Sequence, residues 1–382
     1  MNSRHLPERG RAASGGFAVS PAFRRRLPCS TLRADFGFIV ASGWTGAIST
    51  GADAMWAMIA REQGGPEVLR LEEVPAPVPG PGQIMVAVCA CGVNFADSLI
   101  LRGSYQVKPP LPFSPGAEIC GVVEALGPGV ETLRIGDRVA GTCGYGGYAQ
   151  KALMPAHAVI PLPGGMDDLV AAAFPIVYGT SHIALRHRAR LKPGETLAVH
   201  GAAGGVGLTA VEIGKALGAR VIATASSPEK LAVAREHGAD ELIDSSCEDV
   251  RERIKALTGG QGADVIYDPV GGDMFDASLR AIAFEGRILV IGFAGGRIPQ
   301  IPANILMVKN VDVIGVNWGA YLEKSPDVTR DSFSELAGWY VEGGIRPYVS
   351  DVFPLEKTPD AIRHVMERRA RGKVVVTMTD RA

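Results

Sequence analysis

The sequence predicts an α/β protein in which a doubly wound parallel sheet follows a β-rich unit. The first part of the chain is typical of short apolar strands separated by glycine and proline, up to about residue 174. From there, strands alternate with segments of helical periodicity, and a glycine-rich turn follows the first of these strands. A chain of 382 residues is long enough for about two domains that each have a core.

The β-rich unit is expected over residues 55–174. Its turns, such as 79–82 and 127–129, hold the glycine and proline residues that tight turns require. Representative predicted strands are 84–88, 119–123 and 138–140. The close spacing of strands and turns indicates a compact β-rich domain.

The doubly wound sheet is expected over residues 175–318. Its predicted strands are 196–200, 220–224, 241–243, 263–267, 287–291 and 312–316. Helices are predicted between them at 206–217, 227–236, 250–258 and 274–281. After residue 318, helical stretches at 333–342 and 361–370 precede a closing strand at 373–377. We expect this tail to return to the β-rich unit.

Composition argues against a nucleic acid or a membrane as the partner. With 39 basic and 40 acidic side chains, the chain has no net charge that would attract a polyanion. No apolar run approaches the roughly 18 residues needed to cross a bilayer. The six cysteines form no Cys-x-x-Cys pair and are interpreted as small buried residues. This usage fits a reducing compartment, and we predict a cytoplasmic protein.

The first 54 residues differ from the rest of the chain, because they are rich in arginine, including the run Arg24–Arg26, and poor in acidic residues. A targeting segment is one interpretation, since such leaders direct import and residues 36–48 are apolar. Prolines interrupt any amphipathic helix, however, and the apolar stretch begins far from the N-terminus. We therefore favour a disordered or spurious extension, with the functional start near Met55 or Met58.

A glycine-rich turn between an apolar strand and a helix carries the strongest functional signal. It comprises Ala203, Gly204, Gly205, Val206 and Gly207. Backbone N–H groups and the helix N-terminus at such a turn can hold a pyrophosphate. Gly204 lacks the Cβ that would block the phosphate, and Gly207 allows the helix to pack closely on the strand. The turn predicts a dinucleotide site, with a tight turn that binds no ligand as the alternative.

The end of the second parallel strand decides between NADH and NADPH. An NAD site would place a carboxylate about 20 residues after the turn to bind the ribose, and none stands there. Ser226 and Lys230 instead offer a hydroxyl and a cation to a 2′-phosphate. NADPH is therefore the predicted cofactor. Lys230 could also be a solvated surface lysine, and Arg220 or Arg235 could take its place.

Several motifs together resemble the quinone oxidoreductase branch of the medium-chain dehydrogenase/reductase superfamily, the branch that includes zeta-crystallin. These motifs are residues 64–69, 92–97, 115–118, 136–139 and 202–207. The resemblance implies a GroES-like catalytic domain built from residues 55–174 and 319–382, and a Rossmann domain at 175–318. It also implies an active site in the cleft and a homodimer that pairs through the sheet edge at 311–316.

The same resemblance implies a site without metal. Zinc-dependent relatives have a Cys where this chain has Asn94, and a His where it has Ala117. They also carry a four-cysteine lobe, whereas residues 141–149 contain Cys143 alone. A catalytic zinc needs about three protein ligands and a structural zinc about four. We therefore predict no metal in either place.

Four residues match the family positions near the nicotinamide and the substrate: Asn94, Asp97, Tyr105 and Thr180. Asn94 is expected to contact the cofactor amide or ribose, and Tyr105 to donate a hydrogen bond to a substrate oxygen. A helix cap is the alternative role for Asp97, and a packed loop aromatic for Tyr105. Leu99 stands where the family commonly has a tyrosine.

Turns after the later parallel strands are expected to complete the cofactor site. The predicted contacts are Ser245, Val270, Phe293 and Asn317. Ser245 takes the position of a family tyrosine that covers the adenine, and Asn317 could equally be an ordinary turn asparagine.

The sequence thus predicts an NADPH:quinone oxidoreductase that works by direct hydride transfer. The motifs do not separate a quinone from another conjugated carbonyl compound, so an alkenal or enone reductase is the first alternative. A non-catalytic NADPH-binding protein is the second, because the family includes abundant proteins that keep the cofactor site.

Overall fold

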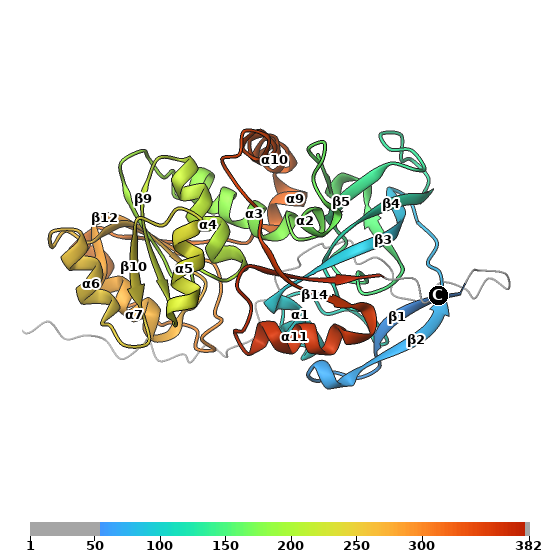
Figure 1. Cartoon of the computed structure of the whole chain (residues 1–382), viewed down its shortest axis with the longest axis horizontal. Coiled ribbons are helices and arrows are strands. Elements are labelled where there is room, and N and C mark those ends of the chain that lie inside the picture. Colours follow the sequence, from blue (N-terminus) through green and yellow to red (C-terminus); the bar gives the residue numbers. More distant parts are fainter. Residues whose placement is uncertain (1–53, 379–382) are drawn as a thin grey trace, which may run out of the picture. The chain divides into compact units, whose positions relative to one another are not determined.

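The computed structural model describes residues 54–378, as Figure 1 shows. The predicted N-terminal extension lies outside the described residues except for Ala54, which begins the first strand. Within residues 54–378, no helix is long and apolar enough to cross a membrane.

A parallel sheet of six strands, counted over the described residues, confirms the predicted doubly wound architecture. The strands are β8 (Thr196–Val199), β9 (Arg220–Ala225), β10 (Glu241–Asp244), β11 (Ala263–Asp268), β12 (Ile282–Val290) and β13 (Asp312–Gly315). They lie in the order β10-β9-β8-β11-β12-β13, and all neighbours are parallel. The order runs outward in both directions from β8, so the crevice beyond the carboxyl ends of β8 and β11 is where such sheets bind ligands.

Helices cover both faces of this sheet. They are α4 (Gly205–Ala216), α5 (Pro228–Glu236), α6 (Val250–Leu257) and α7 (Gly272–Ala281). Leu197 and Val199 of β8 share a core with residues of α4 and α5, whereas Ala198 shares a second core with residues of α6 and α7. Burial on both faces explains why these strands are continuous apolar runs in the sequence.

The β-rich part contains a second sheet and a separate hairpin, which precedes the strands of the sheet in the sequence. The sheet contains β3 (Gln83–Val93), β4 (Glu118–Leu126), β5 (Arg138–Thr142), β6 (Lys151–Pro155), β7 (Val159–Ile160), β14 (Val349–Pro354) and β15 (Lys373–Thr377); the hairpin is β1 (Ala54–Ala60) and β2 (Leu69–Pro75). Strand β15 pairs antiparallel with β3, so strands from the end of the chain join strands from its beginning. The residue limits predicted for the two domains stay predictions.

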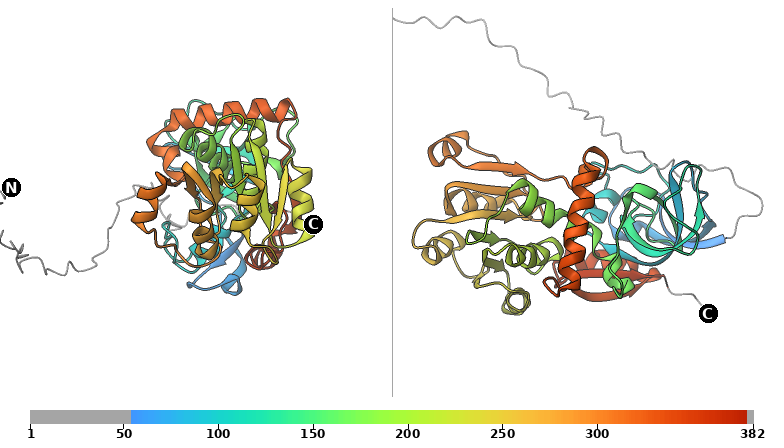
Figure 2. Two further views of the ribbon diagram at one scale, coloured as in Figure 1. Left: turned by 90° about the vertical axis from the view of Figure 1, so that its left-hand side faces the viewer. Right: turned by 90° about the horizontal axis from the view of Figure 1, so that it is seen from above.

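Further helices lie in the chain outside the four that cover the parallel sheet. They are α1 (Phe95–Leu101), α2 (Asp168–Ala172), α3 (Pro175–His182), the π-helical segment Ile183–Arg188, α8 (Ala303–Lys309), α9 (Gly319–Lys324), α10 (Pro326–Val341) and α11 (Thr358–Met366). The long helix α10, orange-red in Figure 2, packs against α3. The ring of Phe333 in α10 lies 6.2 Å from that of Phe174, which precedes α3.

Several predicted elements differ from the structure. The last helix ends at Met366 rather than residue 370, because Arg368 adopts a left-handed backbone conformation with φ 57°. Strand β12 begins at Ile282 rather than residue 287, since Glu285, with φ 58°, interrupts its periodicity. Helix α10 begins at Pro326 instead of residue 333. Strand β14 and helices α8 and α9 were not predicted from the sequence.

Candidate active site and cofactor site

The glycine-rich turn joins β8 to α4, and Gly204 is the N-cap of that helix. A Cβ on Gly207 would lie 2.1 Å from the carbonyl oxygen of Gly201, so only glycine permits this close approach. The first N–H groups of α4 therefore stand directly at the carboxyl end of β8. An α-helix leaves these N–H groups without partners inside the helix, which makes the turn suited to a phosphate.

The other predicted cofactor residues lie at the same edge of the sheet, because each follows the carboxyl end of a parallel strand. They are Ser226 after β9, Ser245 after β10, Val270 after β11, Phe293 after β12 and Asn317 after β13. Ser226 and Asn317 are exposed, and Phe293 keeps 38% of its surface exposed. The structure brings the five together at the edge where a dinucleotide would lie, and their contacts with it stay predictions.

Lys230 lies at the start of α5, next to two arginines from the end of the chain. Its Nζ donates to the carbonyl oxygen of Arg368 over 2.6 Å. Burial lowers the pKa of Lys230, and the positive charges of Arg368 and Arg371 lower this pKa further. Arg220 and Arg235, the alternatives from the sequence, instead bind Glu241 and backbone carbonyl oxygens. Lys230, Arg368 and Arg371 therefore form a group of positive charges, here called the basic pocket, and its contact with a 2′-phosphate stays a prediction.

Asn94 stands before α1, where both ends of its side-chain amide have partners. Its Oδ1 accepts from Nζ of Lys373, and its Nδ2 donates to Oε1 of Glu118, both over 2.8 Å. Nζ of Lys373 also donates to the same Glu118 oxygen over 2.8 Å. The other oxygen of Glu118 accepts from the backbone N–H of Ile176 in α3, 2.8 Å away. This buried cluster fixes Asn94 relative to both β15 and α3.

Asp97 is fully buried below Asn94. Its Oδ2 accepts from the Tyr148 hydroxyl over 2.7 Å and from the backbone N–H of Asn94 over 2.8 Å. Its Oδ1 has no hydrogen-bond partner, and burial raises the pKa of this carboxyl to about 6. Through these contacts Asp97 holds the loop that carries Asn94. This fits the helix cap that was the alternative role for Asp97.

Tyr105 and Thr180 lie on two further segments of the chain. Tyr105 is half-buried in the loop after α1; burial raises the pKa of its hydroxyl, and the nearby charge of Asp97 raises it further. The hydroxyl therefore stays protonated at neutral pH and can donate a hydrogen bond. Thr180 is buried on α3, one turn after the Ile176 that binds Glu118.

Sequence reasoning missed Glu118 and Lys373 as members of the site. Each is the charged first residue of a mostly apolar strand, with Glu118 fully buried and the Lys373 side chain 7% exposed. A charge inside an apolar strand indicates a buried partner, and this signal was present in the sequence. It does not say which residue the partner is.

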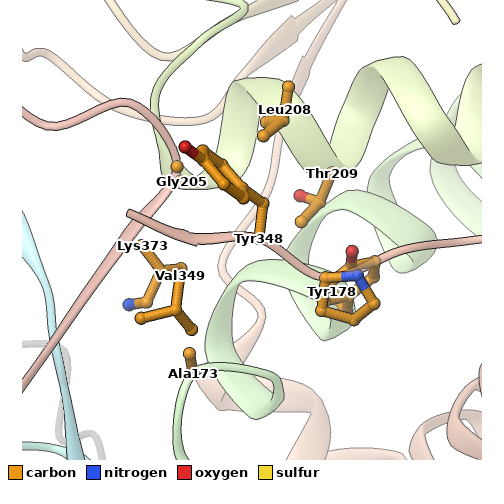
Figure 3. Close-up of a pocket in the computed structure, with 10 residues that line it drawn as sticks. Ala173, Tyr178, Gly205, Leu208, Thr209, Tyr348, Val349 and Lys373 are labelled. Atoms are coloured by element: carbon orange, nitrogen blue, oxygen red, sulfur yellow. The ribbon is translucent and has the colours of Figure 1, made fainter. Parts of the chain in front are cut away.

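The C-terminal strand also contacts the glycine-rich turn. The Gly372 N–H donates to the Ala203 carbonyl oxygen over 2.8 Å. Figure 3 shows a small pocket next to this contact, with Gly205, Tyr348 and Lys373 among the residues that line it. The turn predicted to bind the cofactor and the cluster around Asn94 are therefore connected through β15.

The part of the chain that the structure describes contains no set of side chains suited to bind a metal ion. Among residues 54–378, no group of three or more His, Cys, Asp or Glu side chains could hold an ion. Asn94 and Ala117 stand at the two positions where zinc-dependent relatives have Cys and His. The cation that contacts Asn94 is the ammonium group of Lys373.

Comparisons with known proteins agree with this fold. Residues 80–164 match the alcohol dehydrogenase GroES-like domain, and residues 205–337 match a family described as zinc-binding dehydrogenase. Together the two matches define a medium-chain dehydrogenase fold. The chain is 42% identical over 330 residues to a quinone oxidoreductase-like protein 2 homolog from Nematostella vectensis, covering 86% of this chain and 90% of that protein.

Proteins named quinone oxidoreductase are also similar along their whole length. The protein from Rattus norvegicus is 34% identical over 338 residues, which is 87% of this chain and 100% of the relative. The structure of Escherichia coli quinone oxidoreductase complexed with NADPH has 30% identity and a TM-score of 0.80, covering 85% of this chain and 100% of that one. This chain belongs to the zinc-independent quinone oxidoreductase family of medium-chain dehydrogenases/reductases, as its motifs predicted.

Proposed function

We propose that this protein is an NADPH:quinone oxidoreductase that transfers hydride from NADPH to a quinone without a metal. Membership of the family makes the chain an NADPH-dependent oxidoreductase. The quinone is the finer part of the proposal, and it is supported by the names of the relatives. The observation that carries the proposal is the direct connection between the glycine-rich turn and the polar cluster around Asn94.

The residues of the site fit NADPH. The N–H groups at the start of α4 would hold its pyrophosphate, and the basic pocket of Lys230, Arg368 and Arg371 would hold its 2′-phosphate. When bound, NADPH supplies a hydride to the acceptor. Asn94 would orient the nicotinamide through its side-chain amide, and the tight turn would keep the phosphates in place.

Tyr105 completes the reaction on the acceptor side. Its hydroxyl donates a hydrogen bond to a carbonyl oxygen of the quinone and stabilises the negative charge that develops there as hydride is added. The hydride would bring two electrons and one hydrogen, so a single proton from Tyr105 or from solvent completes the hydroquinone. A Tyr105 that donates this proton is reprotonated from solvent. Asp97 keeps the loop of Asn94 in place and touches neither cofactor nor acceptor.

A turnover assay tests this function. NADPH oxidation is measured against a panel of quinones and enones, with NADH in parallel and with a chelator in one arm. We expect faster oxidation with quinones, little activity with NADH and no effect of chelation. Turnover of enones alone would favour the enone reductase, and NADPH binding without turnover would favour a non-catalytic protein. Activity lost on chelation and restored by zinc would overturn the metal-free mechanism.

We also propose a cytoplasmic homodimer that forms through the outer edge of β13. This strand is the last in the sheet order of the described residues, and an open edge is prone to pair with another chain. Nearby helix α8 exposes Met307 and Val308 to 73% and 72%, which are apolar surfaces that a second copy would cover. Light scattering at micromolar concentration should give the mass of a dimer, and a monomer would contradict the proposal.

A further inference from the structure

We propose that Lys373 is a positioning residue that locks the amide of Asn94 in one orientation and ties it to the cofactor turn. The proposal rests on the proposed function only in that NADPH binds at the glycine-rich turn. Lys373 does not touch the reacting atoms in this proposal, because it acts through Asn94.

All three donors of the Lys373 ammonium group make hydrogen bonds. Its Nζ donates to the carbonyl oxygen of Val93, to Oδ1 of Asn94 and to Oε1 of Glu118, each over 2.8 Å. An ammonium has three donors, so no N–H is left over. The Lys373 and Glu118 side chains are 7% and 0% exposed. Burying such a pair is expensive unless every donor is satisfied, and it contributes little net stability even then.

This arrangement fixes which way the Asn94 amide points. Its oxygen faces the ammonium group and its nitrogen faces the carboxylate of Glu118. A flipped amide would set N–H against the ammonium group and oxygen against the carboxylate, and both contacts would be repulsive. Nδ2 also donates to the Gly92 carbonyl oxygen over 3.4 Å, a long hydrogen bond that a shorter one to a ligand would replace.

The backbone of the same strand reaches the cofactor turn. Gly372, next to Lys373, donates to Ala203, and Gly372 and Gly204 form an isolated bridge. A Cβ on Gly205 would lie 3.1 Å from Cδ of Lys373, so the lysine stem passes directly beside the turn. Figure 3 shows Lys373 and Gly205 at the same pocket. One residue therefore sets the distance between the phosphate-binding turn and Asn94.

The experiment removes both charges of the pair, because Lys373→Met alone would leave the Glu118 carboxylate buried without a counter-ion. The double variant Lys373→Met with Glu118→Gln has no unpaired charge, yet no longer enforces the orientation of Asn94. The matched control is Arg287→Met with Glu195→Gln, a partly buried ion pair at the opposite, amino-terminal edge of the parallel sheet. Thermal unfolding is measured for both, and Lys373→Arg keeps the positive charge but changes the shape of the cation, so that its three short contacts cannot all be made.

We expect the site double variant to bind NADPH within a few-fold of the wild type and to lose at least about 10-fold in kcat, since misplaced reactants react slowly. The control pair should keep its kcat, and Lys373→Arg should recover part of it. Equal losses of kcat in the two double variants, or a site variant with normal kcat, would overturn the positioning role. If the site double variant fails to fold, the kcat of Lys373→Arg tests the proposal instead. A normal kcat with this longer, planar cation would also overturn the positioning role.

A second readout does not depend on turnover. The fluorescence of bound NADPH reports how firmly the nicotinamide is held, so we expect its enhancement on binding to be smaller in the site double variant at equal saturation. An unchanged enhancement would contradict the proposal. If the wild type oxidised no NADPH with any acceptor, the proposed function would fail, while this measurement would still test Lys373.

Discussion

Replacing Gly207 with alanine is expected to weaken NADPH binding by more than about 100-fold. The added Cβ would lie 2.1 Å from the Gly201 oxygen and 2.9 Å from the Ala202 Cα, and both atoms belong to the backbone. Helix α4 must therefore move away from the turn. A charge-assisted hydrogen bond contributes about 1.5 to 3 kcal/mol, and each 1.4 kcal/mol is a factor of ten in Kd, so losing two phosphate contacts gives this effect. Fluorescence titration with NADPH measures it.

A glycine that has room for a side chain provides the control. Gly338 lies in α10, and nothing stands within 4 Å of the position that its Cβ would take. Gly338→Ala should leave NADPH binding unchanged and raise the stability by about 0.4 to 1 kcal/mol, because alanine loses less backbone entropy on folding. If Gly207→Ala bound NADPH as tightly as Gly338→Ala, the phosphate site would not be at this turn.

The parallel sheet could be predicted from the sequence because its strands are buried on both faces. Such strands are unbroken apolar runs, and the glycine-rich turn marks where the first of them ends. The closing strand at 373–377 was predicted to the residue, since a glycine precedes its apolar run. Glu285 shows the limit of this reasoning: a single residue with φ 58° hid the first half of β12.

Contacts between residues far apart in the sequence could not be predicted. Lys373 and Glu118 are 255 residues apart, and pattern alone says only that each needs a partner. The basic pocket shows the same limit. The segment 366–371 has the composition of a helix end, but the left-handed Arg368 turns the chain so that its carbonyl oxygen meets Lys230. Pairings of this kind depend on the tertiary fold, which local periodicity does not contain.

Cofactor choice should depend on the basic pocket. Lys230→Ala is expected to weaken NADPH binding by roughly 10-fold to 150-fold, because one charge-assisted contact with the 2′-phosphate is lost, while NADH binding changes little. Arg371→Ala should act in the same direction with a smaller effect, since Arg371 is exposed and its charge is screened by solvent. The dissociation constants of both cofactors are measured for each variant.

The control for this prediction is on the same helix. Arg235→Ala removes a cation of α5 whose guanidinium donates to the carbonyl oxygens of Ala239 and Asp240, away from the pocket. Its effect on the binding of NADPH and of NADH should therefore be equal and small.

Raising the salt concentration should weaken NADPH binding in the wild type more than in Lys230→Ala, because salt screens the charge that the variant lacks. Equal losses for NADPH and NADH in Lys230→Ala would show a structural role, and tighter binding of NADH than NADPH by the wild type would refute the basic pocket as a 2′-phosphate site.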